Sequence, residues 1–395
     1  MSIGFLVGAG LLAICTACAL WPPRWPGPLG VATYLVGMVY NELPVLAILL
    51  AVATTMPGLL EGDLDAPLDL VAAAVLMAAL TGLVVVLWRA LRSGDVQERA
   101  MAEGLGPHWR TEIDPVLAGR LRRKMPVLRT LLLPFLRRRF DVERIPNLVY
   151  ADGGRRQRLD VYRHSLRPAG GPVLVHLHGG HFVSGAKNRE SLPLLYRLAS
   201  QGWVCISANY RLSPRAKFPD YVVDVKRVLA WVRQHGPAYG ADPSTVFVAG
   251  NSAGGYLAAF AALTQNQAAF QPGFVDADTS VTAAIGLYGY YGRTEGDVPE
   301  SSPKAHIHPD APPFLLLHGD RDSVVPVEWG RRFADALRAV SRQPVVWTEL
   351  PEAQHSFDYF ASPRAWRAVD QIEAFAAWVR SRRGVPVSRD GQRLA

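Results

Sequence analysis

The most constraining feature of the sequence is the segment Gly250-Asn251-Ser252-Ala253-Gly254, in which glycines stand two residues before and two residues after a serine. An apolar run, 245–249, precedes it, and a run of small residues, 255–264, follows it. Glycines at these two positions let a strand turn sharply into a helix, and the serine hydroxyl then stands clear of the backbone. The segment therefore predicts a strand, a tight turn and a helix, with Ser252 as a candidate nucleophile.

From residue 147 onward, apolar runs alternate with helical patterns. The apolar runs are 159–162, 173–178, 203–208, 245–249, 281–288, 314–317 and 345–350, and the helical patterns include 221–235, 329–340 and 364–382. Such alternation is typical of an α/β fold with a doubly wound, mostly parallel sheet. The turn sequence Ala-Asp-Gly-Gly at 151–154 indicates a hairpin that adds an antiparallel edge.

Two further candidate residues follow predicted strands downstream of the serine. Asp322 comes shortly after the run 314–317, and His355 comes shortly after the run 345–350. A serine hydroxyl becomes nucleophilic when an imidazole accepts its proton, so we expect His355 to act as the base and later as the acid. Asp322 would hold the imidazole in the required tautomer, whereas its rival Asp320 lies nearer the strand end, where it can cap the loop. The order Ser, Asp, His is that of a hydrolase triad on a doubly wound sheet.

A glycine turn follows the second apolar run and offers donors for an oxyanion. Gly179, Gly180 and His181 form this turn, and their backbone N–H groups can point at a developing negative charge. The N–H of Ala253, directly after the serine, is the expected partner donor. In this arrangement His181 contributes through its backbone, and His178 orients the turn by hydrogen bonding.

Four segments of the chain match the motifs of a known family. They are His178-Gly179-Gly180, Asn209-Tyr210-Arg211-Leu212-Ser213-Pro214, Phe218-Pro219 with Asp224, and Gly250-Asn251-Ser252-Ala253-Gly254-Gly255. Together they resemble the hormone-sensitive-lipase-like branch of α/β-hydrolase esterases. Gln271-Pro272-Gly273-Phe274 with 276–280, and His318-Gly319-Asp320-Arg321-Asp322, more narrowly resemble membrane-attached carboxylesterases of actinobacteria.

This resemblance covers residues 147–382 and implies an α/β-hydrolase fold, ester hydrolysis, and Asp322 as the acid of the triad. The chain departs from the family pattern at two positions. His181 stands where the family usually has a third glycine, and Asn251 stands where it often has an acid. Both departures bear on the size of the substrate.

The N-terminal quarter of the chain has a different composition. Three long apolar stretches, 3–21, 29–56 and 66–88, are each long enough to cross a bilayer of about 30 Å, which takes roughly 20 helical residues. The alternative for the first stretch is a signal peptide, but no positive charge precedes it and two apolar stretches follow. We therefore expect residues 1–92 to form a membrane region with about three transmembrane helices.

Charge placement predicts an orientation for this region. The acidic loop 61–65 has no basic residue, whereas Arg89 and Arg92 follow the third stretch. By the positive-inside rule the loop is outside and the catalytic domain is cytoplasmic, in a multi-pass protein of the cell membrane. Glu42 and Pro44 interrupt the second stretch, so a short re-entrant or interfacial helix is the alternative, and it would change the parity of the topology.

Most of the net charge of +8 lies between residues 120 and 144, where nine basic residues outnumber two acidic ones. The bases are Arg120, Arg122, Arg123, Lys124, Arg129, Arg137, Arg138, Arg139 and Arg144, and large apolar residues lie between them. A basic amphipathic stretch after a membrane region is typical of a helix lying on anionic headgroups. The alternatives are a linker helix packed on the catalytic domain and a nucleic-acid-binding patch, which no recognition fold accompanies. We assign 93–146 to this basic linker or cap segment, 147–384 to the catalytic domain and 385–395 to a frayed tail.

The remaining candidate residues have simpler interpretations. Cys15 and Cys18 lie in an apolar stretch and Cys205 in a predicted core strand, so they offer no disulfide framework. His306 and His308 have no carboxylate or thiol cluster beside them. We therefore expect no metal and no cofactor.

The sequence thus predicts a membrane-anchored serine carboxylesterase or lipase that forms an acyl-enzyme intermediate. Its expected partners are an ester or lipid substrate and membrane lipids, and no nucleic acid. A transacylase or thioesterase would use the same triad, and a hydrolase fold kept for binding is the alternative without catalysis. The presence of Ser252, Asp322 and His355 together favours the enzyme.

Overall fold

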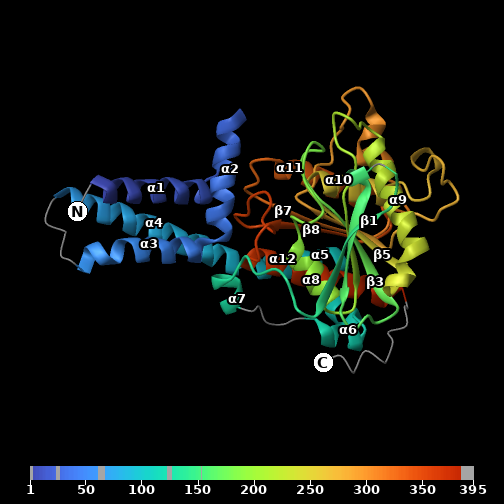
Figure 1. Ribbon diagram of the computed structural model, residues 1–395, viewed down its shortest axis with the longest axis horizontal. Coiled ribbons are helices and arrows are strands. Elements are labelled where there is room, and N and C mark those ends of the chain that lie inside the picture. The colour runs from blue at the N-terminus through green and yellow to red at the C-terminus, as the bar shows by residue number, and fades with distance from the viewer. Residues whose placement is uncertain (1–2, 24–26, 61–66, 122–126, 153, 384–395) are drawn as a thin grey trace.

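The computed structural model describes residues 3–23, 27–60, 67–121, 127–152 and 154–383. A helical arm, residues 3–91, extends from a domain built on one sheet (Figure 1). The arm consists of α1 (Ile3–Leu20), α2 (Gly27–Glu42), α3 (Pro44–Leu60) and α4 (Pro67–Leu91). α4 packs between α1 and α3, whereas α2 stands across their ends, beside the sheet domain (Figure 1).

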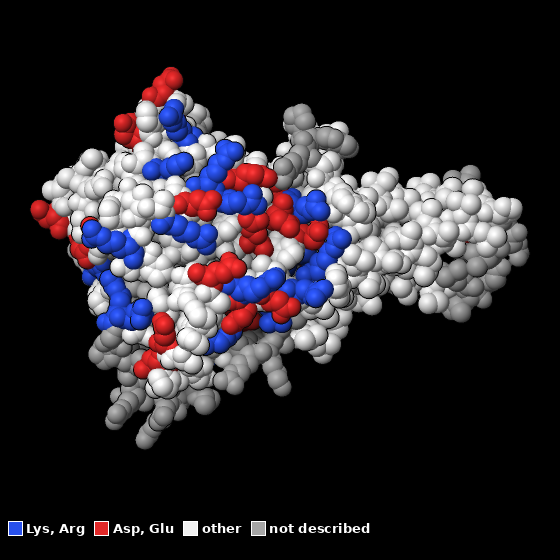
Figure 2. Space-filling view, turned by 180° about the vertical axis from the view of Figure 1, so that it is seen from behind, with Lys and Arg blue, Asp and Glu red and all other residues white. Residues whose placement is uncertain are grey.

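The helical arm presents apolar side chains to its surroundings. Exposed examples are Val7, Leu11 and Ile14 in α1, Leu49, Leu50 and Met56 in α3, and Leu70, Met77 and Val84 in α4. On the face shown in Figure 2, the described part of the arm shows almost no charged side chains, whereas the sheet domain carries many of both signs. Monomeric soluble proteins rarely expose so large an apolar surface. Among the described residues, one helix, Pro67–Leu105, is long and apolar enough to cross a membrane, and α1 is shorter.

The second predicted stretch, 29–56, is not one straight helix. α2 and α3 together pass the same test of length and composition, but they meet at a bend of 88°. Pro44 explains the break, because its ring removes a backbone donor and clashes with the preceding turn of a helix. α2 therefore leaves the direction of the other arm helices and ends at Glu42, which is buried. The expectation of three transmembrane helices stays a prediction.

The sheet has eight strands in the order β1-β2-β4-β3-β5-β6-β7-β8. The strands are β1 (Val142–Val149), β2 (Arg158–His164), β3 (Gly171–Leu177), β4 (Val204–Ala208), β5 (Ala241–Asn251), β6 (Ala283–Leu287), β7 (Phe314–Gly319) and β8 (Val345–Leu350). β2 runs antiparallel to both neighbours, and the pairs from β4 to β8 are parallel. The mostly parallel sheet and its antiparallel edge hairpin are as predicted.

Helices cover both faces of the sheet. They are α5 (Ser93–Leu105), α6 (Pro115–Arg120), α7 (Val127–Leu132), α8 (Leu192–Ala199), α9 (Asp220–His235), α10 (Ala253–Leu263), α11 (Val327–Val340) and α12 (Pro363–Arg382). Short 3-10 turns lie at Trp109–Glu112, Gly154–Gln157, Gly236–Tyr239, Ala268–Phe270, Pro299–Ser301 and Pro303–His306. One apolar core joins the sheet to α9, α10 and α11, and a second joins it to α8 and α12.

The described part of residues 93–144 packs on the sheet domain. Met101 and Trp109 are buried in the second core, and the last three residues of the basic stretch belong to β1. Further along, the carbonyl of Pro134 accepts a hydrogen bond from the N–H of Ala361 at 2.9 Å, and the ring of Phe135 contacts Phe360 edge to face. These contacts agree with the linker alternative for this segment, while residues 122–126, which hold three of its bases, lie outside the described residues. A contact with lipid headgroups stays a prediction.

Candidate active site

Ser252 lies at the turn between β5 and α10, as the glycine spacing predicts. Its φ of +53° lies in the left-handed region, which costs energy for a residue with a side chain. A Cβ on Gly250 would lie 2.1 Å from the carbonyl oxygen of Gly254, and one on Gly254 would lie 2.0 Å from that of Leu177. Any side chain at either glycine would therefore force the turn open. The backbone N–H of Ser252 donates to Leu287 O at 2.9 Å, which ties the turn to the end of β6.

Asp322 and His355 lie together on loops that follow β7 and β8. His355 Nδ1 is 2.7 Å from Asp322 Oδ2, and the other carboxylate oxygen accepts the backbone N–H groups of Val324 and Val325 at 2.8 Å each. Burial alone would raise the pKa of Asp322, but His355 and His318 outweigh it through charge and hydrogen bonding, so its pKa lies below the ordinary value. Asp322 is therefore ionised and able to hold Nδ1 as the protonated nitrogen, which leaves Nε2 as the free base.

Asp320, the rival acid, has a different role in the structure. Its carboxylate accepts the backbone N–H of Glu352 at 2.6 Å and so ties the loop after β7 to the loop after β8. Burial, with the negative charge of Glu352, raises the pKa of Asp320 to about 6. No hydrogen bond joins Asp320 to His355 in the described structure. The geometry therefore favours Asp322 as the partner of His355.

Ser252 and His355 converge on the end of β6 without a direct hydrogen bond between their side chains in the described structure. Tyr288, the residue after β6, packs its ring against His355 with centroids 4.5 Å apart, while Leu287 accepts from the Ser252 backbone. The side chains of Ser252 and His355 are both buried. The hydrogen bond between nucleophile and base often forms with good geometry only when substrate is bound.

The predicted oxyanion turn lies beside the nucleophile. A Cβ on Gly179 would lie 3.1 Å from the Cβ of Ser252, and both Gly180 and His181 have positive φ values. Among the described residues, none accepts a hydrogen bond from the backbone N–H of Gly180, His181 or Ala253. These three groups are therefore available to bind an oxyanion, and that role stays a prediction.

Gly179 does not fit its predicted role as an oxyanion donor. Its backbone N–H donates to Glu190 Oε2 at 2.6 Å, so this group is already satisfied within the protein. Burial raises the pKa of Glu190 to about 7. Glu190 lies 11 residues further along the chain, just before α8, and no local motif marks it as a partner of the turn. Gly179 is therefore the close-packing residue of the turn, and Glu190 is the group that orients it.

His178 orients the same turn from the other side. Its Nδ1 lies 2.6 Å from Gly179 O, and its ring stacks on Tyr210 with centroids 4.4 Å apart. Burial lowers the pKa of His178 to about 3, so the ring is neutral and donates through Nδ1. The expected role of His178 is therefore confirmed by its contacts.

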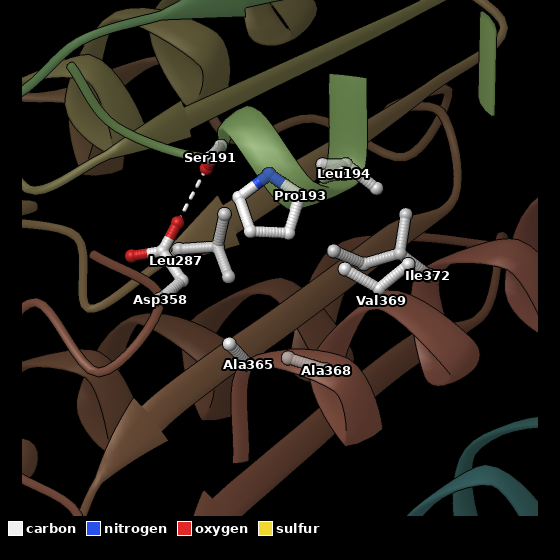
Figure 3. A pocket seen from close by; sticks show the side chains of 9 residues that line it. All are labelled: Ser191, Pro193, Leu194, Leu287, Asp358, Ala365, Ala368, Val369 and Ile372. Carbon is white, nitrogen blue, oxygen red and sulfur yellow. Dashed lines mark hydrogen bonds between the residues drawn. The ribbon is translucent and has the colours of Figure 1, made fainter. Parts of the chain in front are cut away.

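A buried polar network behind the nucleophile escaped the sequence analysis. Asn251 Nδ2 donates to Asp358 Oδ2 at 2.9 Å, and the hydroxyls of Ser191 and Tyr288 also donate to Asp358. Figure 3 shows the Ser191–Asp358 bond at the edge of a cavity of about 10 Å³, whose other walls are apolar side chains. That volume holds a single water at most, so the cavity is not a substrate site. Asp358, three residues after His355, thus places an acid beside Asn251, the position where the family often has one.

The helical arm also reaches the site. The hydroxyl of Tyr34, on α2, donates to Ser356 Oγ at 2.9 Å, and its ring lies edge-on to the His355 ring with centroids 6.1 Å apart. Only the interruption at Glu42 and Pro44 hinted that this stretch differs from a simple membrane span.

The other predicted candidates lie apart from this site. The ring of His306 packs against Phe260 and Phe270, and its Nε2 lies 2.8 Å from a backbone oxygen. Among the described residues, no group of three or more His, Cys, Asp or Glu side chains is placed to hold a metal ion. The thiols of all three cysteines are free.

Comparison with known proteins places the chain among esterases. The BD-FAE family model matches residues 159–295. The chain is 37% identical to the probable carboxylic ester hydrolase LipM of Mycobacterium tuberculosis, over 95% of this chain and 93% of that protein. It is 34% identical to the esterase LipQ of the same organism, over 75% of this chain and 77% of that protein. Because the match to LipM leaves only a twentieth of the chain uncovered, it includes most of the helical arm.

A solved structure agrees with these sequence relatives. The apo form of Thermogutta terrifontis esterase 2 superposes with a TM-score of 0.51 and 26% identity, over 57% of this chain and 91% of that one. The same family is indicated by the sheet order, by the turn at Ser252 and by these relatives. The chain belongs to the hormone-sensitive-lipase-like esterases of the α/β-hydrolase fold, with LipM and LipQ as relatives, and it is a carboxylesterase.

Proposed function

We propose that this carboxylesterase works through Ser252, His355 and Asp322, and that the helical arm anchors it in the cell membrane. The observation that best supports the catalytic proposal is the 2.7 Å contact between His355 and Asp322. It lies at the carboxyl ends of the parallel strands, where Ser252 follows β5.

The reaction follows from this geometry. Ser252 Oγ attacks the carbonyl carbon of the ester while His355 Nε2 takes its proton, and Asp322 stabilises the imidazolium that forms. The N–H groups of Ala253, Gly180 and His181 bind the oxyanion of the tetrahedral intermediate. When the intermediate collapses, His355 returns the proton to the leaving alkoxide, and an acyl-enzyme remains on Ser252. A water then repeats the sequence and releases the acid.

A labelling experiment tests the nucleophile. Ser252→Ala should abolish both reaction with a fluorophosphonate and hydrolysis of p-nitrophenyl esters, since removal of a triad member costs several orders of magnitude. Ser165→Ala is the matched control, because this serine lies in an exposed turn after β2 and should leave labelling unchanged. Full labelling of the Ser252→Ala protein would refute the assignment. A series of acyl chain lengths on the wild-type protein would then define the acyl preference.

Support for the anchor comes from the apolar surface of the arm. α4 has 25 residues and is about 37 Å long, which exceeds a hydrocarbon core of about 30 Å. Arg89 and Arg92 lie at the end of α4 that faces the catalytic domain. With the positive-inside rule, they favour a cytoplasmic catalytic domain. The acidic loop 61–65, on which the orientation also depends, lies outside the described residues.

Extraction tests the anchor. The protein should stay with the membrane fraction after washing with alkaline carbonate and enter solution only with detergent. Release by carbonate alone would show that the arm does not insert.

A further inference from the structure

The proposed base lies on a loop with no regular structure of its own. Residues 351–362, between β8 and α12, form neither helix nor strand. Asp322 fixes the ring of His355 at Nδ1 only, so the direction of Nε2 toward Ser252 depends on how the rest of the loop is held. A displacement of about 1 Å at such a position can cost about a hundredfold in rate.

α2 contacts this loop at its centre. The Tyr34 hydroxyl donates to Ser356, the residue after the base, and Ser356 has a φ of +61° that needs support from its surroundings. The Tyr34 ring lies edge-on to His355, and the ring of Tyr288 contacts the same imidazole. The imidazole therefore has one tyrosine from the sheet and one from the helical arm beside it.

α2 also holds both ends of the loop. At the first end, Asn41 Nδ2 donates to Glu352 O at 2.7 Å. At the other end, Arg364 Nη1 donates to Glu42 Oε1 at 2.8 Å and to Asn41 Oδ1 at 3.0 Å, and Ser362 donates to the second oxygen of Glu42. The Arg364 and Glu42 side chains have 0% and 1% of their surface exposed. We call these contacts of Asn41 and Glu42 the α2 latch.

We infer that α2 is a working part of the active site, and that Tyr34 is a positioning residue that sets the direction of the His355 imidazole. The inference rests on the proposed triad. In this role α2, which the sequence predicts to be part of a membrane span, holds the loop that carries the base, and the α2 latch fixes the helix against both ends of that loop. Figure 1 shows α2 beside the sheet domain.

Kinetics of Tyr34 variants test the inference. The full-length protein in detergent would be assayed with p-nitrophenyl butyrate, and reactive Ser252 would be counted with a fluorophosphonate, so that kcat refers to active sites only. Loss of one hydrogen bond, about 1 kcal/mol, corresponds to about a fivefold change in rate. We expect Tyr34→Phe to lower kcat about fivefold with KM unchanged, and Tyr34→Ala to lower it further. Ser356→Ala should match Tyr34→Phe, and the double variant should lose no more than either alone.

A second tyrosine of the same helix gives the control. Tyr40 interacts with Cys15 on α1 instead of the catalytic loop, so Tyr40→Phe should keep the wild-type kcat per active site. A wild-type kcat per active site in Tyr34→Ala, or a loss explained entirely by fewer reactive sites, would overturn the positioning role. Failure of the triad itself would appear differently, as esterase activity and labelling that survive in Ser252→Ala.

Discussion

Replacing Arg364 by Met removes the cation that neutralises Glu42 in a fully buried pair. Among the described residues, the carboxylate of Glu42 would keep only the hydroxyl of Ser362 as a hydrogen-bond donor. Removing one partner of a buried ion pair typically costs about 3–5 kcal/mol, since the remaining charge is left in a medium that solvates it poorly. We expect Arg364→Met to lower the free energy of unfolding by an amount in this range.

A double-mutant cycle measures the coupling. Urea unfolding in mild detergent, followed by tryptophan fluorescence, would compare Arg364→Met, Glu42→Leu and the double variant with the wild type. Because the double variant buries no unpaired charge, it should recover most of the stability lost in either single variant. The exposed pair of Arg342 and Asp310 is the control, and Arg342→Met should cost less than about 1 kcal/mol. Single-variant losses below about 1 kcal/mol, or losses that simply add, would refute the reasoning.

Four further predictions concern the kinetics of the acid variants, the pH dependence of Asp320→Asn, the orientation and the basic segment. Asp322→Asn should lower kcat by about a thousandfold or more and Asp320→Asn far less, and the opposite ranking in steady-state kinetics would contradict the triad. Since the folded-state pKa of Asp320 is raised to about 6, its contribution to stability is full below its ordinary pKa and is lost as pH rises through 6, so Asp320→Asn should raise the melting temperature more at pH 8 than at pH 4. Cysteines placed at Asp63 and Arg389, both outside the described residues, should differ in intact cells, with an impermeant maleimide labelling only the first, and labelling of the second would place the catalytic domain outside. Changing the arginines at 137–139 to Gln should weaken activity on esters embedded in anionic vesicles while sparing soluble esters, because each base near such a surface contributes about 1 kcal/mol, and equal activity ratios would contradict a headgroup contact.

The parts of the site that the sequence predicts are those fixed by local geometry. The spacing of the glycines around Ser252 is enough to predict its turn. The loops with Asp322 and His355 each follow an apolar strand, and the order of these strands is the one that the fold requires. The preference for Asp322 over Asp320 also follows from local position, since Asp320 directly follows β7 and its carboxylate accepts the backbone N–H of Glu352. Alternation of apolar runs was enough to predict the parallel sheet.

Local sequence patterns do not predict contacts between segments that are far apart in the chain. The backbone N–H of Gly179 could be assigned to an oxyanion only because the sequence does not show that Glu190 occupies it. α2 was missed for a similar reason, since its apolar side chains have the same hydropathy whether lipid or a protein surface covers them. Tyr34 reaches across 322 positions of the chain to Ser356. Only the three-dimensional arrangement brings these two residues together.

The bend between α2 and α3 has a practical consequence for making a water-soluble form of this enzyme. A shortened chain that begins at α5 would discard Tyr34, Asn41 and Glu42 together with the hydrophobic helices. It would bring the guanidinium of Arg364 and the apolar ring of Phe360, which packs with Met38 and Leu43, to a new surface. Truncation would therefore remove the apolar surface of the arm, but it would also remove the contacts that hold the active-site loop. A soluble version should retain α2, for example by linking it directly to α5 in place of α3 and α4.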